Sequence, residues 1–176
     1  MRNNIQEVLS ALSLISIKLG DIEYSRNQIA NNWIGFEPAT PTQIESSQNK
    51  LALEFPDDYV GFLEITNGLS TPNQVEPSFM QVEQIEYLKK VYPLIVEIWS
   101  AYEPLLHIGE QLQRSIIVGG KDEEQYFLLI PPKVKEDNWK YWTFSSWGPG
   151  ETEYSDLKSY FQHVLEFNEQ RRHDKQ

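Results

Sequence analysis

Apolar positions recur at helical spacing near the start of the chain, in the run VLSALSLISI. The residues that share one face are Val8, Leu9, Leu12, Ile15 and Leu19. This pattern predicts an amphipathic helix, and Gly20 and Asp21 indicate where it ends. The polar stretch DIEYSRNQIANN that follows is compatible with a second short helix or with a connector.

A capping box marks the start of the next helix. Thr40 stands at the N-cap, Pro41 at the first helical position and Gln43 at the third, where its side chain can reach back to the cap. The residue before a proline is pushed toward extended backbone, so Leu53–Phe55 are predicted to leave this helix ahead of Pro56.

A second helix is predicted directly after this break, in the stretch PDDYVGFLEITNG. Pro56 suits its first position, and Asp57 and Asp58 lie in the first turn, where the helix dipole favours negative charge. The residues spaced as a buried face are Tyr59, Phe62, Leu63 and Thr66. Asn67-Gly68 supplies a left-handed residue to end the helix. The two helices are predicted to form a sharp corner that contains no side chain of a catalytic type.

The later chain changes from helical spacing to short apolar runs. Helical spacing from Gln84 to Tyr102 is split at Pro93. The runs that predict strands are Leu105–Ile108, Ser115–Val118, Tyr126–Ile130 and Trp139–Phe144, with Ser78–Val82 as a further candidate. A hairpin loop is predicted at Gly119–Asp122 and a turn at Trp147–Gly150.

The last helix is predicted to begin near Ser155 or Asp156. The residues expected on its buried side are Leu157, Tyr160, Phe161, Val164 and Leu165. The tail EQRRHDKQ is predicted to be frayed. Helices, then strands, then a closing helix predict one α+β domain. Its sheet is expected to be curved and mainly antiparallel, with short strands packed against the N-terminal helices and the C-terminal helix.

Composition narrows the choice of partners and location. Asp and Glu number 26 against 15 Lys and Arg, a net charge of −11. Direct binding of nucleic acid or of an anionic membrane is not expected, because both need a basic surface. A basic protein partner is compatible, although acidity that serves only solubility explains the same numbers equally well. Cysteine is absent, the first apolar run is interrupted by serines, and no run reaches membrane-spanning length. A cytoplasmic location is predicted.

No pattern in the chain predicts a catalytic, cofactor or metal site. His107, in a predicted strand, His163 and His173 do not share metal-ligand spacing, and no G-x-S-x-G elbow is present. Gly119-Gly120 lacks the phosphate-binding motifs, and Asp122–Glu124 is typical of a solvated loop. The densest aromatic cluster is Trp139, Tyr141, Trp142, Phe144 and Trp147. It is predicted mainly as core, with any exposed remainder available to a protein interface.

The run PATPTQIESSQNKLALEFPDDYVGFLEITNG resembles the signature of the SUKH superfamily, in its Smi/Knr-like group, which is named from a yeast cell-wall synthesis regulator. That signature has a helix opening after Pro-Ala, then Leu-Pro with acids and Tyr, then Phe-Leu and Asn-Gly. Here Phe55 replaces the usual leucine, and Ser46–Gln48 occupy the place of a common acid. Looser similarity runs from Trp33 to Phe167.

The resemblance implies a division of the chain and a function. Residues 1–32 are predicted as an N-terminal helical extension, 33–170 as one SUKH-like α+β domain and 171–176 as a frayed tail. Bacterial members are mostly immunity proteins that bind and neutralise a cognate toxin, often a nuclease or deaminase, and the family has no catalytic residues to carry over. The alternative is a regulatory scaffold in cell-wall or glucan synthesis. An enzyme or small-ligand module using the Trp-rich region ranks third.

Exposed acidic residues are expected to contact a basic toxin. The candidates, chosen because helix starts and loops tend to expose such residues, are Asp57, Asp58, Asp122, Glu123, Glu124, Glu151 and Glu153.

Overall fold

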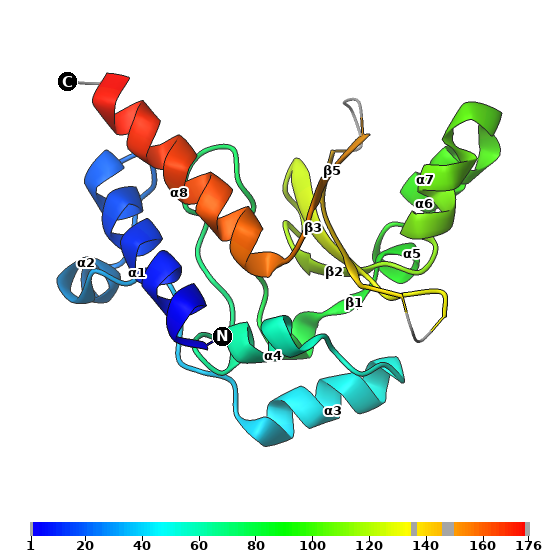
Figure 1. The fold of residues 1–176 in the computed structure, drawn as a ribbon, viewed down its shortest axis with the longest axis horizontal. Coiled ribbons are helices and arrows are strands. Elements are labelled where there is room, and N and C mark those ends of the chain that lie inside the picture. The colour runs from blue at the N-terminus through cyan, green and yellow to red at the C-terminus, as the bar shows by residue number, and fades with distance from the viewer. Residues whose placement is uncertain (1, 135–136, 146–149, 175–176) are drawn as a thin grey trace.

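The computed structural model describes residues 2–134, 137–145 and 150–174. Over these residues it confirms the α+β prediction, with helices around an antiparallel sheet (Figure 1). The helices are α1 (Arg2–Leu19), α2 (Arg26–Asn31), α3 (Pro41–Leu51), α4 (Asp57–Leu63), α5 (Leu88–Val91), α6 (Pro93–Ala101), α7 (Leu106–Leu112) and α8 (Leu157–Asp174). The strands are β1 (Glu86–Tyr87), β2 (Ile116–Gly119), β3 (Gln125–Ile130), β4 (Lys140–Ser145) and β5 (Gly150–Tyr154), and two short 3₁₀ helices are η1 (Val82–Gln84) and η2 (Glu103–Leu105).

The sheet formed by the described residues is a meander in the order β1-β2-β3-β4-β5, with every neighbouring pair antiparallel. β3 and β4 pair along the whole of both strands. All of β2 and most of β3 and β4 are buried, because helices and loops cover the sheet. Beyond β2 the pairing continues through single bridges that tie the first half of the chain to the sheet. These bridges join Gly119 to Phe79, Phe79 to Leu69, and Leu69 to Gly35.

The predicted corner between two helices is present. Thr40 caps α3, with both hydrogen bonds of the capping box in place. Pro56 serves as the N-cap of α4, one position earlier than expected, so that Asp57 begins the helix. The predicted face of α4 is confirmed, since Tyr59, Phe62 and Leu63 are all 0% exposed.

Gly68 has the predicted positive φ, +94°, but it does not cap α4, which ends five residues earlier. A Cβ at this position would lie 2.7 Å from the carbonyl oxygen of Phe79. Glycine is therefore needed here for two reasons: the backbone conformation, and the close approach of the two bridged segments.

An aromatic cluster forms the centre of the core. Phe79 lies within 5.0 to 5.8 Å, between ring centroids, of four other rings. Those rings belong to Phe62, Phe127, Tyr160 and Phe161. The cluster joins α4, β3 and α8 through a residue of the bridged segment, so the predicted buried faces of α4 and α8 meet in one core.

The N-terminal extension is packed into the same fold. α1 lies along α8 and also contacts α4 (Figure 1). Leu9 and Leu12, on the predicted face of α1, are 0% exposed. α8 continues through residues 171–174, which were expected to fray, and Arg171 pairs with Asp21 at 2.8 Å. The extension and the end of the chain therefore hold each other in place.

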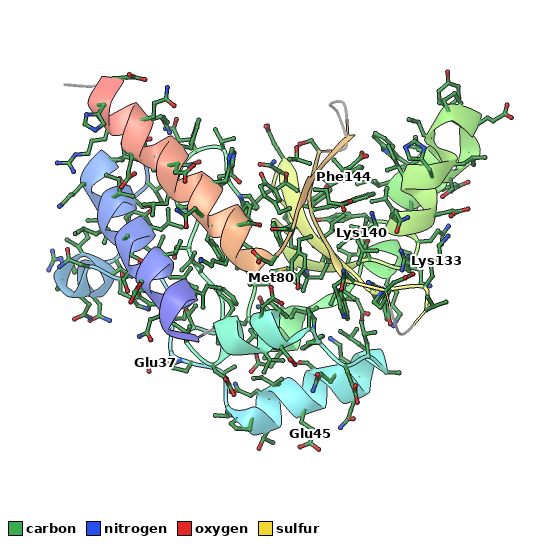
Figure 2. The ribbon with its side chains drawn as sticks, viewed as in Figure 1. Glu37, Glu45, Met80, Lys133, Lys140 and Phe144 are labelled. Atoms are coloured by element: carbon green, nitrogen blue, oxygen red, sulfur yellow. The ribbon has the colours of Figure 1, made fainter. Side chains whose placement is uncertain are left out.

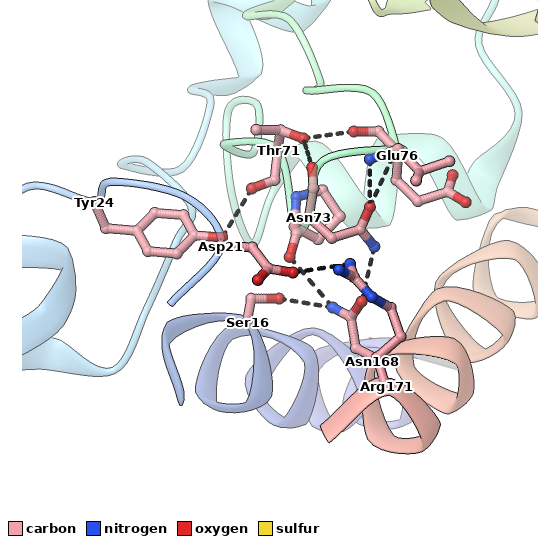
Figure 3. A network of polar contacts seen from close by, with 10 residues as sticks. Ser16, Asp21, Tyr24, Thr71, Asn73, Glu76, Asn168 and Arg171 are labelled. Carbon is pink, nitrogen blue, oxygen red and sulfur yellow. Dashed lines mark hydrogen bonds and ion pairs between the residues drawn. The ribbon is translucent and has the colours of Figure 1, made fainter. Parts of the chain in front are cut away.

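A buried polar network, called the polar junction below, joins α1, the loop at residues 71–76 and α8 (Figure 3). Its members are Ser16, Thr71, Asn73, Glu76 and Asn168. Nδ2 of Asn168 donates to the Ser16 hydroxyl over 3.1 Å, and Oδ1 of Asn168 accepts from Nδ2 of Asn73 over 2.7 Å. Oδ1 of Asn73 accepts from the N–H groups of Val75 and Glu76 at 2.8 and 2.9 Å. Both asparagines are 0% exposed, so these bonds replace the water that burial removes.

Three expectations for the later chain need correction. The run Leu105–Ile108 forms the end of η2 and the start of α7 rather than a strand. The buried residues of α7 have helical spacing, since Ile108 and Leu112 both lie in the core. Ser78–Val82 contributes only a bridge at Phe79 before η1, and β5 was not expected as a strand at all. Of the turn predicted at Trp147–Gly150, residues 147–149 lie outside the described residues.

Candidate partner-binding surface

The acids predicted to contact a partner lie in three separate places. Asp57 and Asp58 form the first turn of α4. The run from Asp122 to Glu124 occupies the turn between β2 and β3, and Glu151 and Glu153 lie on the edge strand β5. The fold therefore does not gather all seven into one patch, and each group has its own surroundings.

Asp58 serves the fold. Its Oδ1 accepts a hydrogen bond from the hydroxyl of Tyr141 at 2.6 Å, and its Oδ2 accepts from the N–H of Leu157 at 3.0 Å. The second bond satisfies a free N–H at the start of α8, which is the role of an N-cap supplied from another helix. Burial, and then the bond to Asp58, raise the pKa of Tyr141 far above its usual value. The neighbouring Asp57 is exposed.

The turn between β2 and β3 is fixed against α6. Asp122 has a φ of +66° and accepts at Oδ1 from the hydroxyl of Tyr92 at 3.0 Å, while its N–H donates to the same hydroxyl oxygen at 2.7 Å. Tyr92 is the residue directly before α6. Glu123 accepts from both the hydroxyl and the N–H of Ser78, the latter at 3.1 Å. Glu124 is exposed. The turn is thus tied through Asp122 to the residue before α6 and through Glu123 to Ser78.

β5 carries the third pair. Glu153 accepts from Nζ of Lys140 and from Nε1 of Trp142, both at 2.8 Å, and the bond to Lys140 lowers the pKa of Glu153 (Figure 2 labels Lys140). Glu151 is half-buried. The first residue of β5, Gly150, lies against Trp99 of α6, since a Cβ there would be 3.4 Å from that ring.

A polar groove of about 860 Å³ runs from the N-terminal extension to the β2–β3 turn. Its acidic residues are Glu23, Asp122 and Glu123, and Lys121 also lines it. Phe36, which lines the groove too, is 44% exposed. One acid of the N-terminal extension and two acids of the turn therefore line the same groove. They are far apart in the sequence, so the sequence analysis did not predict that they lie together.

The α6–α7 segment exposes apolar side chains that the sequence analysis did not single out. They are Leu94, Ile98, Tyr102 and Leu106, at 64%, 57%, 61% and 45% exposed, and they are called the apolar stripe below. The one available indication was composition, because α6 reads PLIVEIWSA and contains only Glu97 and Ser100 as polar residues. A helix of this composition is usually buried on all sides, whereas α6 is buried on one side and exposed on the other.

The stripe rests on a firmly packed base. Trp99, on the inner side of α6, meets Phe144 of β4 edge to face at 5.1 Å (Figure 2 labels Phe144). Gly109 of α7 packs so closely on α6 that a Cβ there would lie 2.7 Å from the carbonyl oxygen of Trp99. Both contacts fix the direction in which the outer residues of α6 point.

The remaining candidates for chemistry are structural or unconnected. Tyr141, Trp142 and Phe144 are at most 5% exposed, so the aromatic strand is core as predicted. Trp139 is half-buried against that core, and Trp147 lies outside the described residues. His107 lies on α7 rather than on a strand. Among the described residues, no three His, Asp or Glu side chains converge in a way that could hold a metal ion. No helix in the described part of the chain is both long and apolar enough to span a bilayer.

The fold is thus an α+β domain whose surface carries an acidic turn and an apolar stripe. Residues 38–167 match the model of the SMI1 / KNR4 family (SUKH-1), and the chain belongs to that family. The match confirms the resemblance inferred from the α3–α4 signature. Comparison with curated proteins gave no match. The family segment leaves out α1, α2 and the end of α8. Of these, α1 and the end of α8 contact each other in part through the polar junction.

Proposed function

We propose that this protein is a non-enzymatic immunity protein, which binds a cognate protein toxin and neutralises it. The observation that carries the proposal is the family match over residues 38–167, together with the immunity role common among bacterial SUKH proteins. The toxin is a nuclease or another nucleic-acid-modifying domain.

The arrangement of polar side chains supports a binding role rather than catalysis. Asp58 and Glu123 are engaged in bonds that hold elements of the fold together. The carboxylate of the half-buried Glu76 accepts from the hydroxyl of Tyr160 at 3.0 Å, on the core side of the polar junction. Acids and hydroxyls are used here to join segments, and general acid–base chemistry would instead require them to face a substrate.

The charge of the chain supports a basic partner. A domain that binds nucleic acid carries a basic surface for the phosphates, and this chain has a net charge of −11. Opposite charges steer two proteins together and raise the association rate more than they slow dissociation. An acidic inhibitor can therefore capture a basic toxin quickly.

Co-expression is the direct test. The toxin domain encoded by the gene beside this one is produced in cells with and without this protein, and survival is counted. We expect protection, and we expect the purified pair to bind with an association rate that falls steeply as salt rises to physiological strength, where charges are screened beyond ~8 Å. Loss of cells despite the protein, with no binding, would refute the proposal. Binding with a salt-independent association rate would refute only the steering.

A further inference from the structure

The outward face of α6 is almost entirely apolar. Leu94, Glu97, Ile98 and Ala101 are the exposed residues of this helix after its first position, and only Glu97 is polar. Tyr102 and Leu106 continue the apolar surface beyond the helix.

This concentration distinguishes the stripe from ordinary surface residues. In the described part of the chain ten large apolar side chains are exposed, and four of them lie in the thirteen residues from Leu94 to Leu106. Single exposed apolar residues are normal, whereas contiguous ones mark interaction sites. The stripe is also fixed by the inner packing of α6 and α7, so a partner meets a surface that is already formed, which reduces the entropic cost of binding.

The charged residues within the stripe segment have one sign. From Pro93 to His107 the charged residues are Glu97 and Glu103, both exposed, and there is no Lys or Arg. The hydrogen bonds between Asp122 and Tyr92 place the acidic β2–β3 turn at the end of α6 where the stripe begins. The basic residues nearest in sequence are already engaged: Lys90 pairs with Glu86 at 3.3 Å, and Lys89 lies over the ring of Tyr87.

This charge pattern selects the occupant. A second copy of the chain would bring Glu97 and Glu103 against acids of the same kind, with a charge of −11 on each partner. A protein surface with apolar anchors and a basic rim complements the stripe in both respects. We infer that the apolar stripe is the docking surface for the basic face of the cognate toxin. This inference rests on the proposed function.

A hollow beside the stripe gives an anchor residue a place to enter. It has a volume of about 410 Å³ and is lined by Val96, Glu97, Ser100 and Ala101 of α6, together with Lys89, Pro93 and Gln113. Side chains that fill such hollows at the centre of an interface contribute most of its binding energy. The toxin is expected to present an aromatic or long side chain at this point.

The test compares two substitutions at equally exposed positions. Ile98→Asp alters the stripe, and Val75→Asp alters a residue of the same exposure, 57%, on the distant 71–76 loop. Both proteins are measured against the neighbouring-gene toxin domain by surface binding. We expect Ile98→Asp to weaken binding by about 100-fold, as for a central anchor, and Val75→Asp to change it less than about threefold. Leu94→Ser with Ile98→Ser is the milder variant if Ile98→Asp does not fold.

A charge test examines the rim separately. Glu97→Lys with Glu103→Lys should slow association several-fold, while the matched pair Glu45→Lys with Glu169→Lys, on α3 and the far part of α8, should not. Figure 2 labels Glu45.

The outcomes separate the surface from the function. A toxin that binds wild type and Ile98→Asp equally would overturn the docking surface and leave immunity intact. A wild-type protein that does not bind the toxin would overturn both. Sedimentation of the wild type adds a third outcome: a dimer at micromolar concentration that Ile98→Asp dissociates would assign the stripe to a second copy and overturn the inference.

Discussion

At one end of the molecule, α1 and α8 enclose two asparagines, while at the other end α6 and α7 leave leucine, isoleucine and tyrosine in solvent (Figure 1). In the polar junction each side-chain amide has internal partners, so burial costs little and the bonds fix how the segments meet. The stripe is the opposite case, because its apolar side chains are exposed to water and have no internal partners to cover them. The comparison separates side chains that serve folding from those available for binding, and it can be tested by substitutions at both ends.

At the α1–α8 end of the molecule, the largest effect is expected within α1. Leu12→Ala should reduce the free energy of unfolding by about 2–5 kcal/mol, because the side chain is 0% exposed and its loss leaves a cavity. Leu14→Ala, on the same helix at 37% exposure, should change it by less than ~0.5 kcal/mol. Urea unfolding measures both. Equal, small effects would mean that α1 does not contribute to the core.

The polar junction is the next target. Asn168→Ala should reduce the free energy of unfolding by about 2–3 kcal/mol, since it leaves the amide of Asn73 and the hydroxyl of Ser16 buried without this partner. Gln162→Ala, at an exposed position of α8, is the control. Urea melts that do not distinguish the two variants would show that the junction adds nothing to stability.

Two neighbouring acids on α4 test the sequence-based assumption that acids at the start of a helix are exposed. Asp58→Ala should cost about 1–2 kcal/mol, because it removes a cap from α8. Asp57→Ala should cost a few tenths of a kcal/mol, the contribution of an exposed charge near a helix dipole. Thermal unfolding of both variants provides the measurement, and the reverse order would contradict the capping role.

Tyr24 makes the extension sensitive to alkaline pH. Its hydroxyl donates to the carbonyl oxygen of Thr71 at 2.9 Å, and burial raises the pKa of Tyr24 to about 12 (Figure 3). Between pH 10 and 12 the unfolded chain loses this proton before the folded protein does, so stability falls as pH rises. In Tyr24→Phe the free energy of unfolding should fall less steeply with pH, and the difference in slope should correspond to at most about one proton. Urea melts from pH 9 to 11.5 would show it, and identical slopes would exclude a role for Tyr24.

The smallest effect on stability is expected at the stripe. Ile98→Ser should change the free energy of unfolding by less than ~0.5 kcal/mol, because the side chain is already in water. The adjacent Trp99→Ala should cost about 3–5 kcal/mol, because Trp99 is 8% exposed and packs on Phe144. A large loss for Ile98→Ser in calorimetry would make the stripe part of the core and remove its availability for binding.

Local chemistry made much of the fold predictable. The capping box at Thr40, the proline break at Pro56 and the buried face of α4 depend on residues close in sequence, and all three appear in the structure, with Pro56 displaced by one position. Short apolar runs were less certain, because four residues such as those at 105–108 fit a strand or one helical turn equally well. β5 was missed because GETEY is polar, and its strand conformation comes from pairing with β4.

The surface could be predicted least. Asp58 and Asp57 look alike in sequence, and only the fold brings Tyr141 and the start of α8 to one of them. Asn73 and Asn168 are 95 residues apart, and nothing local indicates that they meet. The outer face of α6 could not be identified either, because a helix that is apolar all round has no sequence feature that distinguishes its covered side from its free side.

The pairing of α1 with α8 also sets an order of events during synthesis. Ser16 and Asn168 are 152 residues apart, so α1 leaves the ribosome long before its partner exists. At ~5–20 residues per second, about 8–30 seconds separate the two. Throughout that interval the part of the apolar side of α1 that packs on α8 stays uncovered. Nascent chains of this protein are therefore expected to need protection at their N-terminus, and folding is completed only when the last helix emerges.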